Sequence, residues 1–186
     1  MVKILLILVF VPVLLKTLVL LIKRFRLHCR IKKACKNVGT QFKSLSPWFK
    51  SIFWERGKAD YLIGGKIKVS VLTLPYRNAR YHFVPDEKKV DVVLGRRQMF
   101  LINKNVPKGV ASITNVFKLA SFNLFYEENN DGVKHVMLVY PVPREVTCVK
   151  GNKIESLYNG DEITDGIVFN TRSYFFEHLL DYVGLT

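Results

Sequence analysis

Residues 4–36 of the chain read ILLILVFVPVLLKTLVLLI followed by KRFRLHCRIKKACK. The first part is an apolar run of 19 residues that is broken only by Lys16 and Thr17. At about 1.5 Å per helical residue, this run gives a helix of roughly 28 Å, close to the ~30 Å of hydrocarbon that a spanning helix must cross. The sequence therefore predicts one transmembrane helix within residues 1–23, which anchors the rest of the chain.

A cleaved secretory signal peptide would also combine a short basic start with an apolar core. Signal peptidase requires small residues just after that core, whereas the chain has Lys23, Arg24, Phe25 and Arg26 there. We therefore expect a signal-anchor that stays in the mature protein.

The segment after the run carries seven cations and no acid. These cations are Lys23, Arg24, Arg26, Arg30, Lys32, Lys33 and Lys36. Short flanks rich in lysine and arginine stay on the cytoplasmic side of a membrane. We therefore predict a cytoplasmic C-terminal domain, with the cations binding anionic lipid at roughly 1 kcal/mol each near the surface.

The net charge of +14 is concentrated in the first third of the chain. Residues 1–58 hold 13 of the 29 lysines and arginines and one of the 15 acids, which gives +12, and the remainder carries +2. The positive charge is thus a membrane-proximal feature. Anionic lipid is the predicted partner, and no nucleic acid is expected because the remainder has no basic and aromatic recognition motif.

Residues 42–58 add bulky aromatic side chains to this charge. The aromatic residues predicted to bind the membrane surface are Trp48, Phe49, Phe53 and Trp54. Ser46 and Pro47 are typical of a helix start, because serine caps free amides and proline fits the first helical position. The helix would either lie among the lipid headgroups or cover the following domain as a lid, and the sequence leaves both interpretations open.

Residues 59–186 are predicted to form one β-rich globular domain, separated from the anchor by a basic and aromatic juxtamembrane segment at residues 24–58. Residues 66–72 alternate apolar and polar side chains, as a strand buried on one side does. Further strands are predicted at 80–84, 90–94, 99–103, 116–119, 122–126, 133–140, 146–149 and 163–169. We expect an antiparallel β-sandwich or a partly open barrel-like domain, followed by a C-terminal helix that Ser173 caps and Gly184 ends.

No motif with a recognisable chemistry occurs in the domain. The histidines His82, His135 and His178 have no metal-ligand spacing, so we predict no metal, no cofactor and no enzymatic activity. The alternative is a membrane-tethered enzyme with an unrecognised site around His82 or His135. Cys29, Cys35 and Cys148 form no metal or disulfide pattern, in accord with a reducing compartment.

One segment resembles a known family. The residues Lys108-Gly109, Ser121 to Phe125 and Val139-Tyr140-Pro141 resemble the β-rich region of a widespread, poorly characterised bacterial membrane family, whose pattern runs Arg-Gly, Asp-Pro-Phe-Gly-Leu-Phe and Val-Tyr-Pro. The chain departs from that pattern because it lacks the Asp-Pro-Phe-Gly core and the von Willebrand-like domain that follows it in that family.

Taken together, these patterns predict a single-pass membrane protein that presents a cytoplasmic β-rich domain to a protein partner or a larger membrane assembly. An envelope or capsid-type structural protein is a third possible class.

Overall fold

The computed structural model describes residues 2–49, 59–74, 79–94, 117–123, 133–150, 153–164 and 166–184. Within these ranges, the side chains of residues 2–10, 94 and 117–123 are outside the description. The predicted strand at 99–103 and the predicted membrane-binding residues Phe53 and Trp54 lie outside the described residues.

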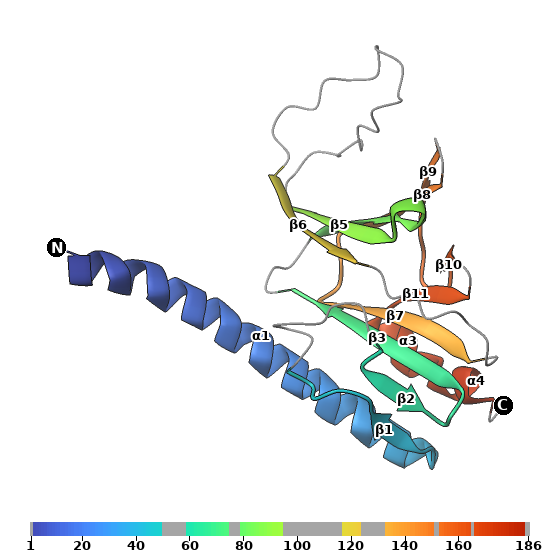
Figure 1. Cartoon of the computed structure of the whole chain (residues 1–186). Coiled ribbons are helices and arrows are strands. Elements are labelled where there is room, and N and C mark those ends of the chain that lie inside the picture. The colour runs from blue at the N-terminus through green and yellow to red at the C-terminus, as the bar shows by residue number, and fades with distance from the viewer. Residues whose placement is uncertain are drawn as a thin grey trace.

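The chain begins with α1, a continuous helix of 37 residues over Val2–Val38 that contains Pro12. It extends well past the predicted end of the anchor at residue 23. In its second half, Leu27, Ile31 and Cys35 recur every four residues and are buried, so one face of the helix packs on the domain. Figure 1 shows the first half projecting beyond the sheets.

Side chains are described only from residue 11 of this helix, whereas the apolar run of the sequence starts at residue 4. Among the described residues, no helix contains an apolar stretch long enough to cross a membrane.

Two β-sheets form the body of the domain (Figure 1). The first has the strand order β1-β2-β3-β7-β11-β10. Its strands are β1 (Phe42–Ser44), β2 (Tyr61–Ile63), β3 (Ile67–Thr73), β7 (Lys134–Tyr140), β11 (Ile167–Thr171) and β10 (Glu162–Thr164). The second has the order β6-β5-β4-β8-β9. Its strands are β6 (Phe117–Asn123), β5 (Lys89–Leu94), β4 (Arg80–Val84), β8 (Glu145–Lys150) and β9 (Lys153–Ser156).

Both sheets are mixed, so the prediction of an antiparallel sandwich is wrong in its strand directions. β7 runs parallel to both β3 and β11, and β4 runs parallel to β8. The reason is that β3–β4 and β7–β8 follow the same path from the first sheet to the second. Their connections are joined by hydrogen bonds from Leu74 N to Tyr140 O at 3.2 Å and from Arg144 N to Ala79 O at 2.9 Å. Over the described residues neither sheet closes into a barrel.

The domain has two hydrophobic cores, one on each face of the six-stranded sheet. The first lies between the sheets and contains Tyr81, Phe83 and Phe169. The second lies between the six-stranded sheet and the helices, where α1 meets α3 (Arg172–Glu177) and α4 (Leu179–Val183). The protein is therefore mainly β, with a layer of helices that includes the second half of α1.

Several predicted elements differ from the observed ones at their ends. Residues 117–119 and 122–123, the described parts of two predicted strands, are joined in β6, and the strand predicted at 163–169 is divided into β10 and β11. The C-terminal helix is present but divided at His178, and it ends at Gly184 with a φ of 71°. Its N-cap is Thr171 rather than the predicted Ser173, and no side chain caps it by a hydrogen bond. A short 3-10 helix, η1 (Pro85–Glu87), joins β4 to β5.

Candidate functional site: the junction between helix α1 and the domain

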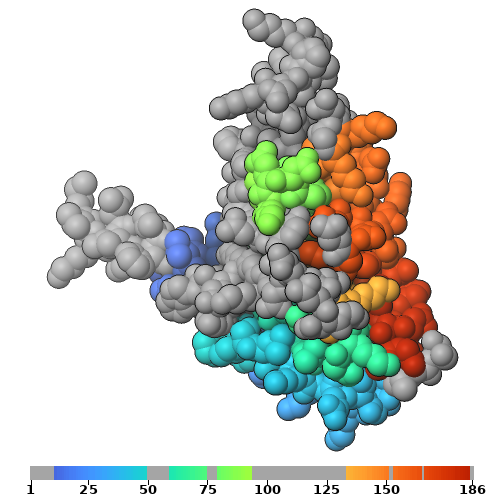
Figure 2. All heavy atoms as spheres, turned by 45° about the vertical axis from the view of Figure 1, so that its right-hand side comes forward, coloured from blue at the N-terminus to red at the C-terminus, as the bar shows by residue number. Residues whose placement is uncertain are grey.

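The projecting half of α1 exposes large apolar side chains in the region where the sequence predicts an anchor. The exposed residues and their exposed fractions are Val11 46%, Val13 57%, Leu14 62%, Leu15 56%, Leu18 52%, Val19 43% and Ile22 42%. No residue from 11 to 23 is buried. In Figure 2 this part of the helix, in blue, lies at the left border of the domain.

Burial begins abruptly at Arg24, which has no exposed surface. Its Nη2 lies 2.5 Å from Oδ1 of Asp60, and its Nε donates to the carbonyl of Trp48 at 3.3 Å. The second carboxylate oxygen of Asp60 accepts a hydrogen bond from the backbone N–H of Val71 at 2.7 Å. Arg24 therefore joins α1 to the strand β3, whereas the sequence places it among the cations at the membrane surface.

Aromatic side chains contact one another near Arg24, at Phe25 of α1 and at Trp48, whose carbonyl accepts from Arg24. The rings of Phe25 and Trp48 have centroids 5.3 Å apart, and Trp48 contacts Phe49 edge-on at 5.5 Å. Phe25 and Phe49 are 49% and 44% exposed. Of the predicted surface aromatics, Trp48 and Phe49 are thus at the junction, in a bend and turn where the sequence predicted a helix start at Ser46.

A second aromatic cluster fixes α1 to the edge of the six-stranded sheet. His28 of α1 lies 5.5 Å from Phe42 of β1 and 5.6 Å from Tyr61 of β2, measured between ring centroids. Burial raises the pKa of Tyr61 to about 12 and lowers the pKa of His28. Residues 24–44, which the sequence assigns to a separate juxtamembrane segment, therefore share a core with residues 61–71.

The remaining predicted cations lie on α1 without entering the core. Arg26, Arg30, Lys32, Lys33 and Lys36 are exposed, and Lys23 is half-buried. All are carried by one helix, so each successive residue lies about 1.5 Å further along its axis. The structure thus separates the predicted cations into the buried Arg24, the half-buried Lys23 and five solvent-exposed residues.

The residue that sequence reasoning missed is Asp60. It is 2% exposed and takes part in three backbone hydrogen bonds besides the ion pair, through Asp60 N, Asp60 O and Oδ2. In the sequence Asp60 is marked only by its position as an acid between a basic segment and the first predicted strand. Such a position is equally typical of a residue in a solvated loop.

The histidines suggested for an alternative active site lie within sheets. His82 of β4 is 3% exposed, and its Nδ1 is 2.6 Å from Oγ1 of Thr147 on β8. Asp91 is its register partner on β5 and is also buried. Burial lowers the pKa of His82, which favours the neutral ring. The structure therefore places His82 in a buried polar cluster of the five-stranded sheet.

His135 and His178 are distant from this cluster in the fold. His135 lies in β7 and is 5% exposed. His178 lies between α3 and α4, where its ring stacks on Tyr174 at a centroid distance of 4.0 Å. Among the described residues, no group of histidines, cysteines and acids has the arrangement of a metal site.

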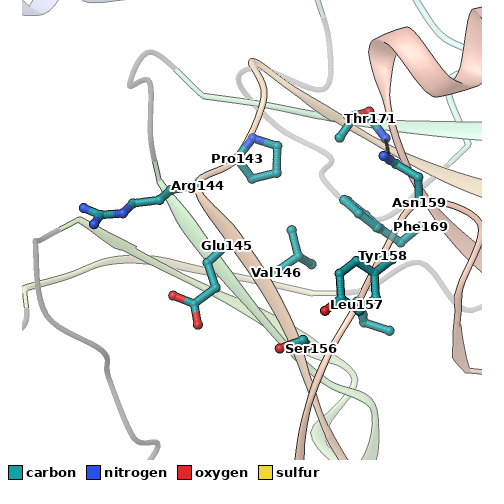
Figure 3. A pocket seen from close by; sticks show the side chains of 10 residues that line it. All are labelled: Pro143, Arg144, Glu145, Val146, Ser156, Leu157, Tyr158, Asn159, Phe169 and Thr171. Atoms are coloured by element: carbon teal, nitrogen blue, oxygen red, sulfur yellow. Dashed lines mark hydrogen bonds between the residues drawn. The ribbon is translucent and has the colours of Figure 1, made fainter.

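A shallow hollow of about 370 Å³ opens between the start of β8, the segment after β9 and the strand β11. Figure 3 shows Val146 and Phe169 projecting into the space between these segments, while Arg144 points away from it. The rim is held by a hydrogen bond of 2.7 Å from Thr171 N to Oδ1 of Asn159. The hollow offers apolar and polar contacts but no arrangement of catalytic groups among the residues that line it.

Comparison with known proteins gives no relative: no family model matches the chain, and no curated protein or solved structure matches it significantly.

Proposed function

We propose that the protein is a single-pass membrane protein whose N-terminal helix is a signal-anchor that holds a β-rich interaction domain at the cytoplasmic face of the membrane. The observation that carries the proposal is the abrupt change on α1. Ile22 is 42% exposed, and Arg24, two residues and about 3 Å further along the helix, is fully buried against the domain. The exposed apolar surface therefore ends where the helix enters the domain.

Membrane insertion is supported by the exposed side chains and by the sequence together. A helix that is apolar on all sides is stable in lipid or inside a larger core, and not in water. The apolar run begins at residue 4, so the described part from residue 11 is its second half. Phe25, Trp48 and Phe49 lie just beyond Ile22, at the level where aromatic side chains favour the membrane–water interface.

The cytoplasmic orientation is supported by the cations that follow the run, because a lysine- and arginine-rich flank resists translocation.

The interaction role is supported by the hollow beside β9 and by the exposed apolar side chains of Ile154 and Tyr158, which are 45% and 72% exposed. We propose a protein partner, in a membrane assembly, for this part of the domain.

The alternative is a membrane-tethered enzyme, and the contact of His82 with Thr147 is the observation that favours it. A catalytic histidine must reach its substrate, and His82 is 3% exposed. Measurable turnover that is lost in a folded His82→Gln variant would support this alternative over the interaction domain.

Two measurements on the full-length protein test the proposal. After carbonate extraction of cells that express it, the protein should remain with the membrane pellet. A C-terminal tag should be digested by protease in inverted vesicles and protected in intact cells. Release of the protein by carbonate would contradict the anchor, and digestion of the tag from outside intact cells would contradict the orientation.

A further inference from the structure

The solvent face of α1 carries an unbroken series of positive charges that the fold does not use. We call it the cationic face and define it by Arg26, Arg30, Lys32, Lys33 and Lys36. All five side chains are exposed. Among the described residues, no carboxylate lies within 4.0 Å of any of them. Their charges are therefore open to a partner.

The arrangement of these residues follows the helix. Arg26, Arg30 and Lys33 have the spacing i, i+4 and i+7 and share one side of the helix, and Lys32 and Lys36 lie on the adjoining side. From Arg26 to Lys36 the axial rise is about 15 Å. The cationic face is thus a band about three helical turns long that covers nearly half of the helix circumference.

If the helix is anchored as proposed above, lipid reaches only the N-terminal end of the cationic face. The inference rests on that proposal. Lys33 and Lys36 lie about 16 and 21 Å along the axis beyond Ile22. The headgroup zone adds only about 5–7 Å to the hydrocarbon on each side. Even a helix tilted by about 40° keeps Lys33 and Lys36 roughly 13 and 16 Å from the hydrocarbon, which is beyond the headgroup zone.

We propose that the cationic face is a docking site for an acidic helical segment of a partner protein, with Lys33 and Lys36 as the contacts that lipid does not reach. A partner helix with carboxylates at i, i+4, i+7 and i+11 presents a stripe of matching length and opposite charge. Charge complementarity of this kind accelerates association and selects partners.

The spacing of the cations on α1 destabilises the helix, which favours a role in binding over a role in fixing the membrane topology. Arg26 and Arg30, like Lys32 and Lys36, are like-charge pairs at i, i+4, which destabilise a helix. A cation that only fixes membrane topology needs to be near the membrane, and it needs no particular face or spacing.

The experiment uses the full-length protein in nanodiscs made either of phosphatidylcholine alone or of phosphatidylcholine with phosphatidylserine. The probe is a fluorescein-labelled, alanine-rich peptide with four glutamates at the spacing given above, and its binding is followed by fluorescence anisotropy. A peptide with glutamines in their place is the control probe. The test variant is Lys33→Gln/Lys36→Gln. The matched control is Lys150→Gln/Lys153→Gln, which removes the same charge from two exposed lysines at the hairpin of β8 and β9.

We expect the glutamate peptide to bind in both kinds of nanodisc, and the test variant to bind it about fivefold more weakly at low salt. The matched control should bind it as the unchanged protein does. Equal binding by both variants would overturn the proposal. Loss of binding when phosphatidylserine is present would also overturn it, because lipid would then occupy the cationic face. Tighter binding of a single-stranded RNA of equal charge would reassign the face to nucleic acid.

These outcomes are distinct from a failure of the proposed function. A protein that does not enter nanodiscs at all would contradict the membrane anchor. A protein that enters them but does not discriminate between the glutamate and glutamine peptides would contradict only the docking site.

Discussion

Removing one partner of the ion pair between Arg24 and Asp60 should destabilise the domain far more than breaking an exposed ion pair does. The side chains are 0% and 3% exposed, and their charged atoms are 2.5 Å apart. Removing one partner of a buried pair leaves the other charge buried without compensation, which typically costs about 3–5 kcal/mol. The total free energy of unfolding of a domain is about 5–15 kcal/mol, so we expect Asp60→Asn to bring the domain near to unfolding.

Chemical denaturation of the full-length protein in a neutral detergent, followed by tryptophan fluorescence, measures this loss. Arg24→Met should cost a similar amount, and the double variant Arg24→Met/Asp60→Asn should cost no more than either single change. Lys89→Met, which removes a partly exposed contact with Glu87, is the control and should change the free energy of unfolding by less than about 1 kcal/mol. Single variants that each lose less than about 1 kcal/mol, with additive effects, would refute the reasoning.

Three further predictions concern the domain itself. Gly64 has a φ of 59°, and a Cβ there would lie 2.9 Å from a threonine hydroxyl, whereas Gly65, with a φ of 68°, faces open space. Gly65→Ala should lower the free energy of unfolding by about 1–2 kcal/mol from backbone strain alone. Gly64→Ala should lower it further, so this variant should unfold at a lower denaturant concentration, and equal unfolding midpoints would contradict this. A maleimide should label the exposed Cys29 in the native protein. It should label Cys35 only after unfolding, because burial raises the pKa of that thiol to about 11. Fast labelling of both cysteines in the native protein would be inconsistent with the packing. Because burial lowers the pKa of His82 below its unfolded value of 6.5, the unfolded state binds the proton first. The contribution of His82 should thus be complete well above pH 6.5 and be lost as the pH falls below it, with a slope of at most about 1.4 kcal/mol per pH unit from this group. His82→Gln should reduce the slope of the denaturation midpoints between pH 7.5 and 5.5, and His28, whose pKa is also lowered, accounts for a slope that remains.

The strands were predictable where the signal is local. The bounds of β4 agree with the prediction at both ends, and β3 is shifted by one residue, because alternating side chains are visible within a few positions. The directions of the strands were not predictable, because the pairing of β3 with β7 joins segments that are far apart in the chain. A local pattern indicates that a strand exists and not which strand lies next to it.

The junction shows the same limit for single residues. In the sequence Arg24 is one of seven similar cations, and nothing near it distinguishes it from Arg26. Its burial depends on two conditions. The helical phase of α1 places Arg24 on the same face as the buried Leu27 and Ile31, and the carboxylate of Asp60, from another part of the chain, pairs with it. Both conditions are tertiary, so a reading of composition assigns Arg24 to lipid together with its neighbours.

The ion pair also bears on how α1 finds its register against the sheet. The buried face of the helix is a simple apolar repeat at Leu27, Ile31 and Cys35. A slip of the helix by one turn would still bring Leu27 and Ile31 onto the sheet, in the places of Ile31 and Cys35. A buried ion pair is a costly source of stability, but it opposes such a slip because only one register brings Arg24 to Asp60. We therefore interpret the ion pair as the contact that fixes the register of α1 against the six-stranded sheet. If this interpretation is correct, a double variant that replaces both partners by apolar residues should remain folded but give more than one set of amide signals for β3, and a single set would contradict it.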